Sequence, residues 1–280
     1  LINCITRIMM RLQRTRLVME LTVIMVTFLS LMSVAEASAH GHNKHQEPLK
    51  YGIFTEECFV KFTEKQDFSD VDCIKKSVSK LVGYAIITGA FMLKVPQIIK
   101  IVSAGSVEGI AVMSYYTEVF MYTNTASFSM HLGLSFSVFG ENLVILVQNM
   151  IIILLIWNYN KTIGIAQKGA FVVLAGLYMT ILFQDQLISE DAWKMIQSSS
   201  NVMILFARCP QIYANFSAKS TGQLAFLTFL LNAVGANVRL LTVLVESDNF
   251  LYNLQFIVGA VLNTILLLQF FLYWNAPAKQ

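Results

Sequence analysis

The chain has 280 residues, of which 56% are hydrophobic and only 13% are charged, whereas soluble domains carry about 25% charged residues. This composition argues against an ordinary soluble enzyme and favours a multi-pass membrane protein with apolar spans of about 20 residues each. The net charge of +3 is small and the lysines are scattered, so we expect a lipid bilayer and no nucleic acid as partner.

Residues 1–39 have the layout of a secretory signal peptide. After a start at Met9 or Met10, Arg11, Arg14 and Arg16 precede an apolar run at residues 21–34, and Ala37-Ser38-Ala39 matches the small-x-small cleavage pattern. The alternatives are an uncleaved first helix or translated upstream sequence. We therefore treat residues 1–39 as a signal peptide or an upstream extension.

Residues 40–77 are polar and mixed in charge, and we expect them to form a lumenal N-terminal segment. If this segment is lumenal, a disulfide between Cys58 and Cys73 would close a short loop, which stabilises by about 3 kcal/mol. Two free thiols are the alternative. The four cysteines have no CxxC spacing, and the histidine tract at residues 40–45 lacks further ligands, so no metal site is expected.

Long apolar runs separated by short polar breaks begin at Val78. This pattern predicts an all-α membrane protein with seven transmembrane helices. The expected spans lie at about residues 78–100, 109–130, 139–157, 167–186, 193–213, 223–244 and 253–274.

The charges of the loops predict the orientation of these helices. Lysines follow the first, third, fifth and seventh helices, whereas the loops after the fourth and sixth are mainly acidic. The positive-inside rule assigns the lysine-bearing side to the cytosol. The N-terminus is then lumenal, and the tail at residues 275–280 is cytosolic. The lysines concerned are Lys100, Lys161, Lys168, Lys219 and Lys279.

A short polar sequence occurs twice in the apolar runs. Lys94-Val95-Pro96-Gln97 returns 114 positions later as Arg208-Cys209-Pro210-Gln211, and aligning the prolines also pairs Ile98 with Ile212. This indicates an internal duplication. We expect two parallel three-helix repeats at residues 78–157 and 193–274, joined by a linker helix and its loops at residues 158–192. Repeats of this kind enclose a site near the membrane midplane in some transporters.

Four charged side chains at membrane depth are candidate substrate-binding residues, because such groups are costly and usually functional. Lys94 and Arg208 could bind a phosphate, or could snorkel to an interface or pair with a carboxylate. Glu118 is the expected partner of Lys94, and Arg239 could serve an acidic ligand or Glu141.

The Pro-Gln pairs have a different expected role. Pro96 and Pro210 predict helix kinks, and Gln97 and Gln211 are expected to satisfy backbone groups at those kinks rather than to bind a ligand. Metalloprotease, hydrolase and P-loop motifs are absent. We therefore expect no catalytic residue, no cofactor and no enzymatic activity.

A wider set of residues carries a resemblance to a known family. The chain resembles the mannose-phosphate-dolichol utilization defect family of PQ-loop proteins over about residues 47–276. The residues concerned are Leu93-Lys-Val-Pro-Gln97, Ser106-Val-Glu-Gly109, Gly140-Glu141, Thr221-Gly-Gln-Leu224, Arg239 and Phe271-Leu-Tyr-Trp-Asn-Ala276.

The resemblance implies an endoplasmic reticulum membrane protein needed for the use of dolichol-phosphate mannose, and dolichol-phosphate glucose, by lumenal glycosyltransferases. N-glycan and GPI-anchor assembly would depend on it. Moving the lipid-linked sugar across the membrane and presenting it to transferases both stay open. The PQ-loop architecture alone also resembles SWEET and cystinosin carriers of small solutes, and a non-transporting scaffold for glycosyltransferases is a third hypothesis.

Overall fold

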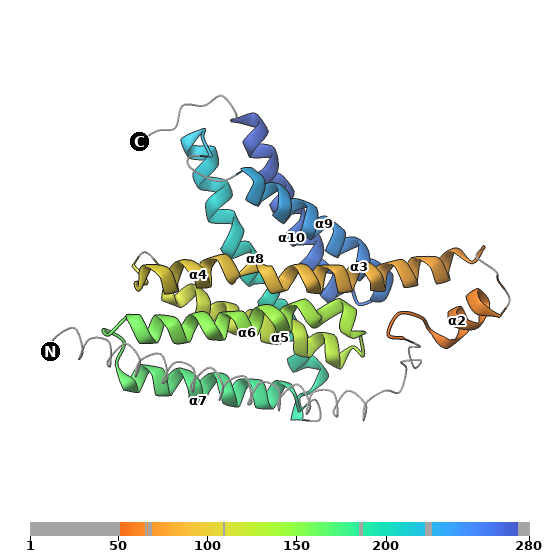
Figure 1. Ribbon diagram of the computed structural model, residues 1–280, viewed down its shortest axis with the longest axis horizontal. Helices are drawn as coiled ribbons and strands as arrows, with labels where there is room; N and C mark the ends of the chain where they lie inside the picture. The colour runs from red at the N-terminus through yellow and green to blue at the C-terminus, as the bar shows by residue number, and fades with distance from the viewer. Residues whose placement is uncertain are drawn as a thin grey trace.

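The computed structural model describes residues 51–64, 66, 69–108, 110–184, 187–221 and 226–273. The expected signal peptide, the histidine tract and the expected cytosolic tail lie outside the described residues. Polar loops connect the helices of the described part. The helices are α2 (Glu56–Thr63), α3 (Val71–Leu93), α4 (Val95–Ala104), α5 (Val112–His131), α6 (Phe136–Tyr159), α7 (Ile165–Leu182), α8 (Glu190–Ala218), α9 (Phe226–Glu246) and α10 (Phe250–Leu272) (Figure 1).

The first predicted helix differs most from the structure. It begins at Val71, seven residues before the predicted start, because the Asp70 side chain caps the backbone N–H groups of Asp72 and Cys73. It also breaks at Lys94 into α3 and α4, with Pro96 in the first turn of α4. Proline is tolerated in a first turn, where its missing N–H would lack a helical partner in any case.

Several helices are suited to a bilayer. Within the described residues, five stretches are long and apolar enough to span a membrane. The helices α5 and α8 are long enough at 20 and 29 residues, but they are more polar. The chain is thus a multi-pass membrane protein. The five stretches are Val71–Ala104, Phe136–Tyr159, Ile165–Leu182, Phe229–Glu246 and Phe250–Leu272.

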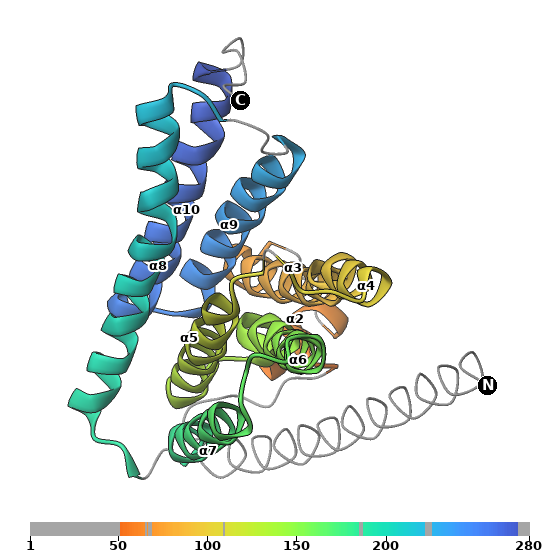
Figure 2. The same ribbon diagram turned by 90° about the vertical axis from the view of Figure 1, so that its left-hand side faces the viewer.

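The helices form two groups. Helices α3, α4, α5 and α6 form a first unit with α7 packed on α5, and helices α8, α9 and α10 form a second unit. Figures 1 and 2 show that the second unit crosses the first at a steep inclination. Both units begin at the end that carries the Cys58–Cys73 disulfide, which we call the disulfide end. The opposite end carries Lys100, Lys161 and Lys219, and we call it the lysine end.

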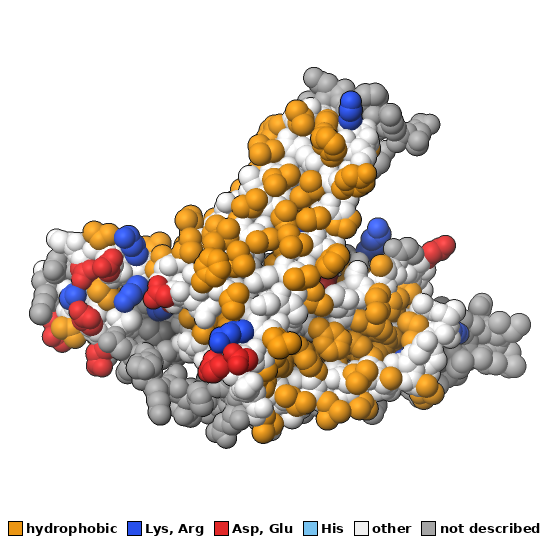
Figure 3. Space-filling model, turned by 180° about the vertical axis from the view of Figure 1, so that it is seen from behind, with side chains coloured by type: hydrophobic (Ala, Val, Ile, Leu, Met, Phe, Trp, Pro, Cys, Tyr) orange, Lys and Arg blue, Asp and Glu red, His pale blue; other side chains and the backbone are white. Residues whose placement is uncertain are grey.

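The two units meet near the disulfide end and diverge toward the lysine end. At the disulfide end one apolar cluster, which includes Phe128, Trp193 and Tyr252, joins α5, α8 and α10. Nearer the lysine end the clusters separate, with one around Ile152 in the first unit and another around Leu266 in the second. Figure 3 shows the resulting notch between the apolar arm of the second unit and the first unit.

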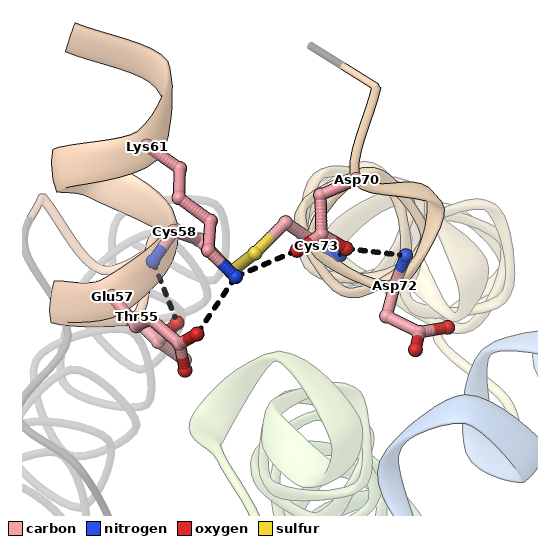
Figure 4. Close-up of polar contacts among 7 residues, drawn as sticks. All are labelled: Thr55, Glu57, Cys58, Lys61, Asp70, Asp72 and Cys73. Carbon is pink, nitrogen blue, oxygen red and sulfur yellow. Dashed lines mark hydrogen bonds and ion pairs between the residues drawn. A yellow bond between two sulfur atoms is a disulfide. The ribbon is translucent and has the colours of Figure 1, made fainter. Parts of the chain in front are cut away.

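A disulfide and a set of ion pairs hold α2 against α3. Cys58 and Cys73 are joined by a disulfide (Figure 4). Lys61 Nζ lies 2.7 Å from both a Glu57 and an Asp70 carboxylate oxygen. The hydrogen bond from Lys61 lowers the pKa of Asp70. Because the folded pKa is depressed, this stabilisation is present at neutral pH and is lost as the pH falls through that pKa.

We expect the double substitution C58S/C73S to loosen α2 from α3 without unfolding the membrane-spanning helices. The disulfide closes a loop of sequence separation 15, and its loss costs about 3 kcal/mol in the chain-entropy model. Amide hydrogen exchange of residues 56–63 should therefore accelerate roughly a hundredfold. Reduced wild-type protein is the matched control and should behave like the variant. Unchanged exchange in both would contradict this role of the disulfide.

Candidate functional site between the two units

The break between α3 and α4 is stabilised by a side chain from α6. The backbone N–H of Lys94 donates to Gln148 Oε1 at 3.2 Å. Gln148 Nε2 donates in turn to the carbonyls of Ala90 and Phe91, at 3.0 and 2.8 Å. Pro96 interrupts the helical hydrogen bonds at this point. The Gln148 amide therefore supplies partners to backbone groups that would otherwise be unsatisfied at membrane depth.

The charge of Lys94 is neutralised within the first unit. Lys94 Nζ lies 2.8 Å from Glu118 Oε2, and Asn149 Nδ2 donates to the same oxygen at 2.8 Å. The ammonium group also lies 5.1 Å from the centre of the Tyr115 ring. The Lys94 side chain is only 15% exposed, so it cannot snorkel freely. The positive charge of Lys94 is thus neutralised by Glu118 and is not free to bind an anionic ligand.

The second Pro-Gln helix is built differently. The helix α8 continues through Pro210 without a break. Arg208 is half-buried and, unlike Lys94, forms no ion pair with the residues that the structure describes. The residue 114 positions after Glu118 is Asn232, which has no negative charge. The second repeat therefore lacks the carboxylate that neutralises its cation.

Arg208 lies on α8, the helix of the second unit that crosses α5 of the first unit. The helix α8 crosses α5 nearer the disulfide end, where Asn124 Nδ2 donates to Ser200 Oγ at 3.2 Å. Arg208 lies about two turns beyond Ser200 along α8. Figure 2 shows that the C-terminal end of α8 extends away from the first unit. Of the basic residues expected at membrane depth, Lys94 and Arg239 form ion pairs, and Arg208 forms none with the residues that the structure describes.

Two buried ion pairs join the units. Arg239 Nε donates to Glu141 Oε1 at 2.7 Å, Nη2 lies 2.6 Å from Oε2, and Nη1 donates to the Ser137 carbonyl at 3.1 Å. Lys80 Nζ lies 2.8 Å from Glu246 Oε2. These four charged side chains are only 6–14% exposed. Both pairs connect α9 to the first unit, so the charge of Arg239 is also internally neutralised.

A seam of hydrogen bonds closes the interface at the disulfide end. Ser129 Oγ donates to the Tyr252 hydroxyl at 2.8 Å, and Gln255 Nε2 donates to Thr125 Oγ1 at 3.0 Å. Gln197 Nε2 donates to Gln255 Oε1 at 2.8 Å. All five residues are buried. Buried polar residues of α5 therefore contact the second unit, whereas Gln197 of α8 bonds to α10 within its own unit.

The amide that satisfies the backbone groups at the first kink is Gln148 of α6, and not Gln97, the expected residue. Gln269 of α10 makes a related contact in the second unit, donating to the Ile212 carbonyl at 2.9 Å. Both residues stand out in the sequence as amides within the most apolar spans, and this signal could have found them.

Lys80 and Glu246 were also not predicted as site residues. Lys80 lies near the start of a long apolar run and Glu246 at the edge of a loop, so each is indistinguishable in sequence from a solvated end residue. The structure pairs them across 166 positions. A local sequence pattern cannot predict an ion pair between residues so far apart in the chain.

A comparison with known families bears on the duplication. Two segments of the chain, residues 78–138 and 192–252, match the PQ loop repeat. The segments begin at 78 and 192 and are therefore 114 positions apart, as are Pro96 and Pro210. They contain Pro96 and Pro210, so the family match and the two Pro-Gln sequences describe the same duplication. The chain is a multi-pass membrane protein that carries two PQ loop repeats.

Proposed function

We propose that the protein acts without catalysis in the endoplasmic reticulum membrane, where it moves or presents dolichol-phosphate mannose and dolichol-phosphate glucose. Lumenal glycosyltransferases would use these lipids for N-glycan, GPI-anchor and related assembly. The proposal is supported by the sequence resemblance and by two PQ loop repeats. The observation that carries it is Arg208, a half-buried cation on the second Pro-Gln helix that forms no ion pair with the described residues.

In this proposal the chain crosses the membrane seven times in a 3+1+3 order. The segment α3–α4 counts as one span, α7 is the linker, and α5 and α8 also cross, hydrogen-bonded to each other through Asn124 and Ser200. The lysine end faces the cytosol by the positive-inside rule. The Cys58–Cys73 disulfide then lies in the lumen, an oxidising compartment in which disulfides persist.

The chemistry of the notch suits a lipid with a phosphate group. A guanidinium group presents paired N–H donors that match two phosphate oxygens. Leu205, one turn before Arg208 on the same face of α8, is an exposed apolar side chain. It can contact an isoprenoid chain while the phosphate meets Arg208. Dolichol-phosphate sugars are made on the cytosolic face, toward which the notch opens in the proposed orientation.

Complementation tests this function. Cells that make dolichol-phosphate mannose but cannot use it should recover full-length lipid-linked oligosaccharide when they express the wild-type chain. Arg208→Gln should fail, Arg208→Lys should restore part of the activity, and the surface variant Lys194→Gln should match wild type, because Lys194 is exposed and pairs only with Asp191 at the disulfide end. Expression levels are compared by immunoblot.

Two outcomes would sink the proposal. Failure of the wild-type chain to restore the oligosaccharide would favour a carrier of a small solute. Full activity of Arg208→Gln would favour a scaffold without a ligand site at the notch. Flipping of a labelled dolichol-phosphate sugar by purified protein in liposomes then separates movement from presentation.

A further inference from the structure

The helix α2 and the first turns of α3 extend beyond the other helices at the disulfide end (Figure 1). Lys80 Nζ of α3 lies 2.8 Å from Glu246, the last residue of α9, and 3.4 Å from Ser135, the residue before α6. Lys80 therefore marks the level at which the other helices end. Residues 71–79 of α3 project about 13 Å farther, at the rise of an α-helix.

This level coincides with the edge of the hydrocarbon core. Lys100, an exposed residue at the lysine end, follows Lys80 by 20 positions in the α3–α4 segment. Twenty residues of helix correspond to about 30 Å, the thickness of the hydrocarbon core. Residues 81–99 therefore fill the core, whereas α2 and residues 71–79 lie at the headgroups of the leaflet at the disulfide end.

One hydrogen bond fixes the start of the projecting segment at the hydrocarbon edge. Tyr84 Oη donates to the carbonyl oxygen of Gly52 at 3.0 Å. Tyr84 follows Lys80 by about 6 Å along the helix, and helical side chains lean toward the N-terminus, so its hydroxyl group reaches back to the edge. Tyr51 and Gly52 have φ angles of 55° and 71°, and the first is uncommon for a non-glycine residue. This turn leaves Tyr51 83% exposed.

The exposed surface at this depth is apolar and aromatic. The Tyr51 ring lies 5.8 Å from the ring of Phe59 in α2. Leu81, which precedes Tyr84 by three positions and so neighbours it on the surface of α3, is 51% exposed. The lipid-facing surface of the span thus continues toward the segment that carries Tyr51.

The charges of the projecting segment favour one kind of lipid. Residues 51–78 contain six acidic residues and four lysines, a net charge of −2. Glu57, in the first turn of α2, has a side chain that is 66% exposed. Anionic headgroups would repel this segment, so a zwitterionic leaflet suits it better.

We propose that residues 51–64 form an interfacial anchor that binds a zwitterionic leaflet at the disulfide end. The Tyr51 ring then lies at the boundary between acyl chains and headgroups, a depth that tyrosine prefers because its ring is apolar and its hydroxyl group is polar. This anchor goes beyond the proposed function, because its partner is the bulk lipid surface and not the lipid-linked sugar. It fixes the depth at which the disulfide-linked α2 lies.

Fluorescence quenching in nanodiscs tests the anchor. The environment-sensitive amino acid Anap replaces Tyr51 in one full-length variant and Glu57 in the matched control. The nanodiscs contain phosphatidylcholine and no second protein, and the quencher is either a doxyl group on the acyl chain or iodide in the buffer. The doxyl group should quench position 51 at least about twofold more strongly than position 57, and iodide should quench the two positions in the reverse order.

Stronger iodide quenching at position 51 than at position 57 would overturn the anchor and leave the surface to a protein partner. Replacing part of the phosphatidylcholine with phosphatidylserine should weaken doxyl quenching at position 51, and stronger quenching would contradict the zwitterionic preference. If the Anap variants do not fold, hydroxyl-radical oxidation of wild-type protein in the same nanodiscs decides. Corrected for intrinsic reactivity, Tyr51 should be oxidised less than Val71, which is only 57% exposed but projects beyond the headgroups. Greater oxidation of Tyr51 would overturn the anchor.

Discussion

Replacing Arg239 with methionine is expected to lower the free energy of unfolding by about 3–5 kcal/mol. The substitution removes the guanidinium group that contacts both carboxylate oxygens of Glu141 and the carbonyl of Ser137. Glu141 is only 14% exposed, so its charge would be left without a counter-ion inside the interface. The loss should appear in SDS-induced unfolding of the purified protein in dodecyl maltoside micelles.

The double variant R239M/E141L is the matched control. Removing both charges leaves no uncompensated carboxylate, and apolar replacements of buried ion pairs are often neutral or stabilising. We therefore expect the double variant to recover most of the stability lost by R239M. A double variant as unstable as the single one would show that packing, and not the unpaired charge, accounts for the loss.

Gly83→Ala is the second substitution with a large expected effect. A Cβ atom at Gly83 would lie 2.4 Å from the backbone oxygen of Ser137, so α3 and α6 must move apart. That oxygen also accepts the hydrogen bond from Arg239 Nη1, so the shift disturbs the contact with the second unit. Overpacking of this kind costs about 1–3 kcal/mol, and occasionally more, and the same SDS titration would measure it.

Gly89→Ala provides a control in the same helix. No atom lies within 4 Å of a Cβ built at Gly89, and alanine is favoured over glycine in a helix interior by about 1 kcal/mol. Gly89→Ala should therefore leave stability unchanged or raise it slightly. Equal losses from the two substitutions would contradict the close approach of α3 and α6 at Gly83.

The positions of the long helices could be anticipated because each apolar run is a local property of the sequence. The break at Lys94 was predictable as a kink from Pro96 alone. Whether the helix only bends there or breaks into two helices was not predictable, because the break depends on Gln148, which lies 54 positions away in the chain. Pro210 has no such effect, and α8 runs through it. Proline marks where a helix can bend, and the neighbouring helix decides whether it opens.

The charged residues of the site could be predicted from the sequence, but the ion pairs that they form could not. Lys94, Glu118, Arg208 and Arg239 were identified because charged residues in apolar runs are conspicuous. Which of these charges is neutralised depends on contacts between distant segments, such as the 98 positions that separate Arg239 from Glu141. The polar residues of α5 and α8 weakened the hydropathy signal of both helices, and only the fold shows that they face each other.

Photo-crosslinking tests most directly whether a lipid-linked sugar binds at Arg208 between the two units. Replacing Tyr122 with p-benzoylphenylalanine puts a reactive group on α5, the helix of the first unit that α8 crosses, and the same replacement of Val173, a 58% exposed residue of α7, is the control. Labelled dolichol-phosphate mannose should crosslink at position 122 and not at 173, and Arg208→Gln should abolish the crosslink. A crosslink of equal yield in the presence and absence of Arg208 would contradict the account.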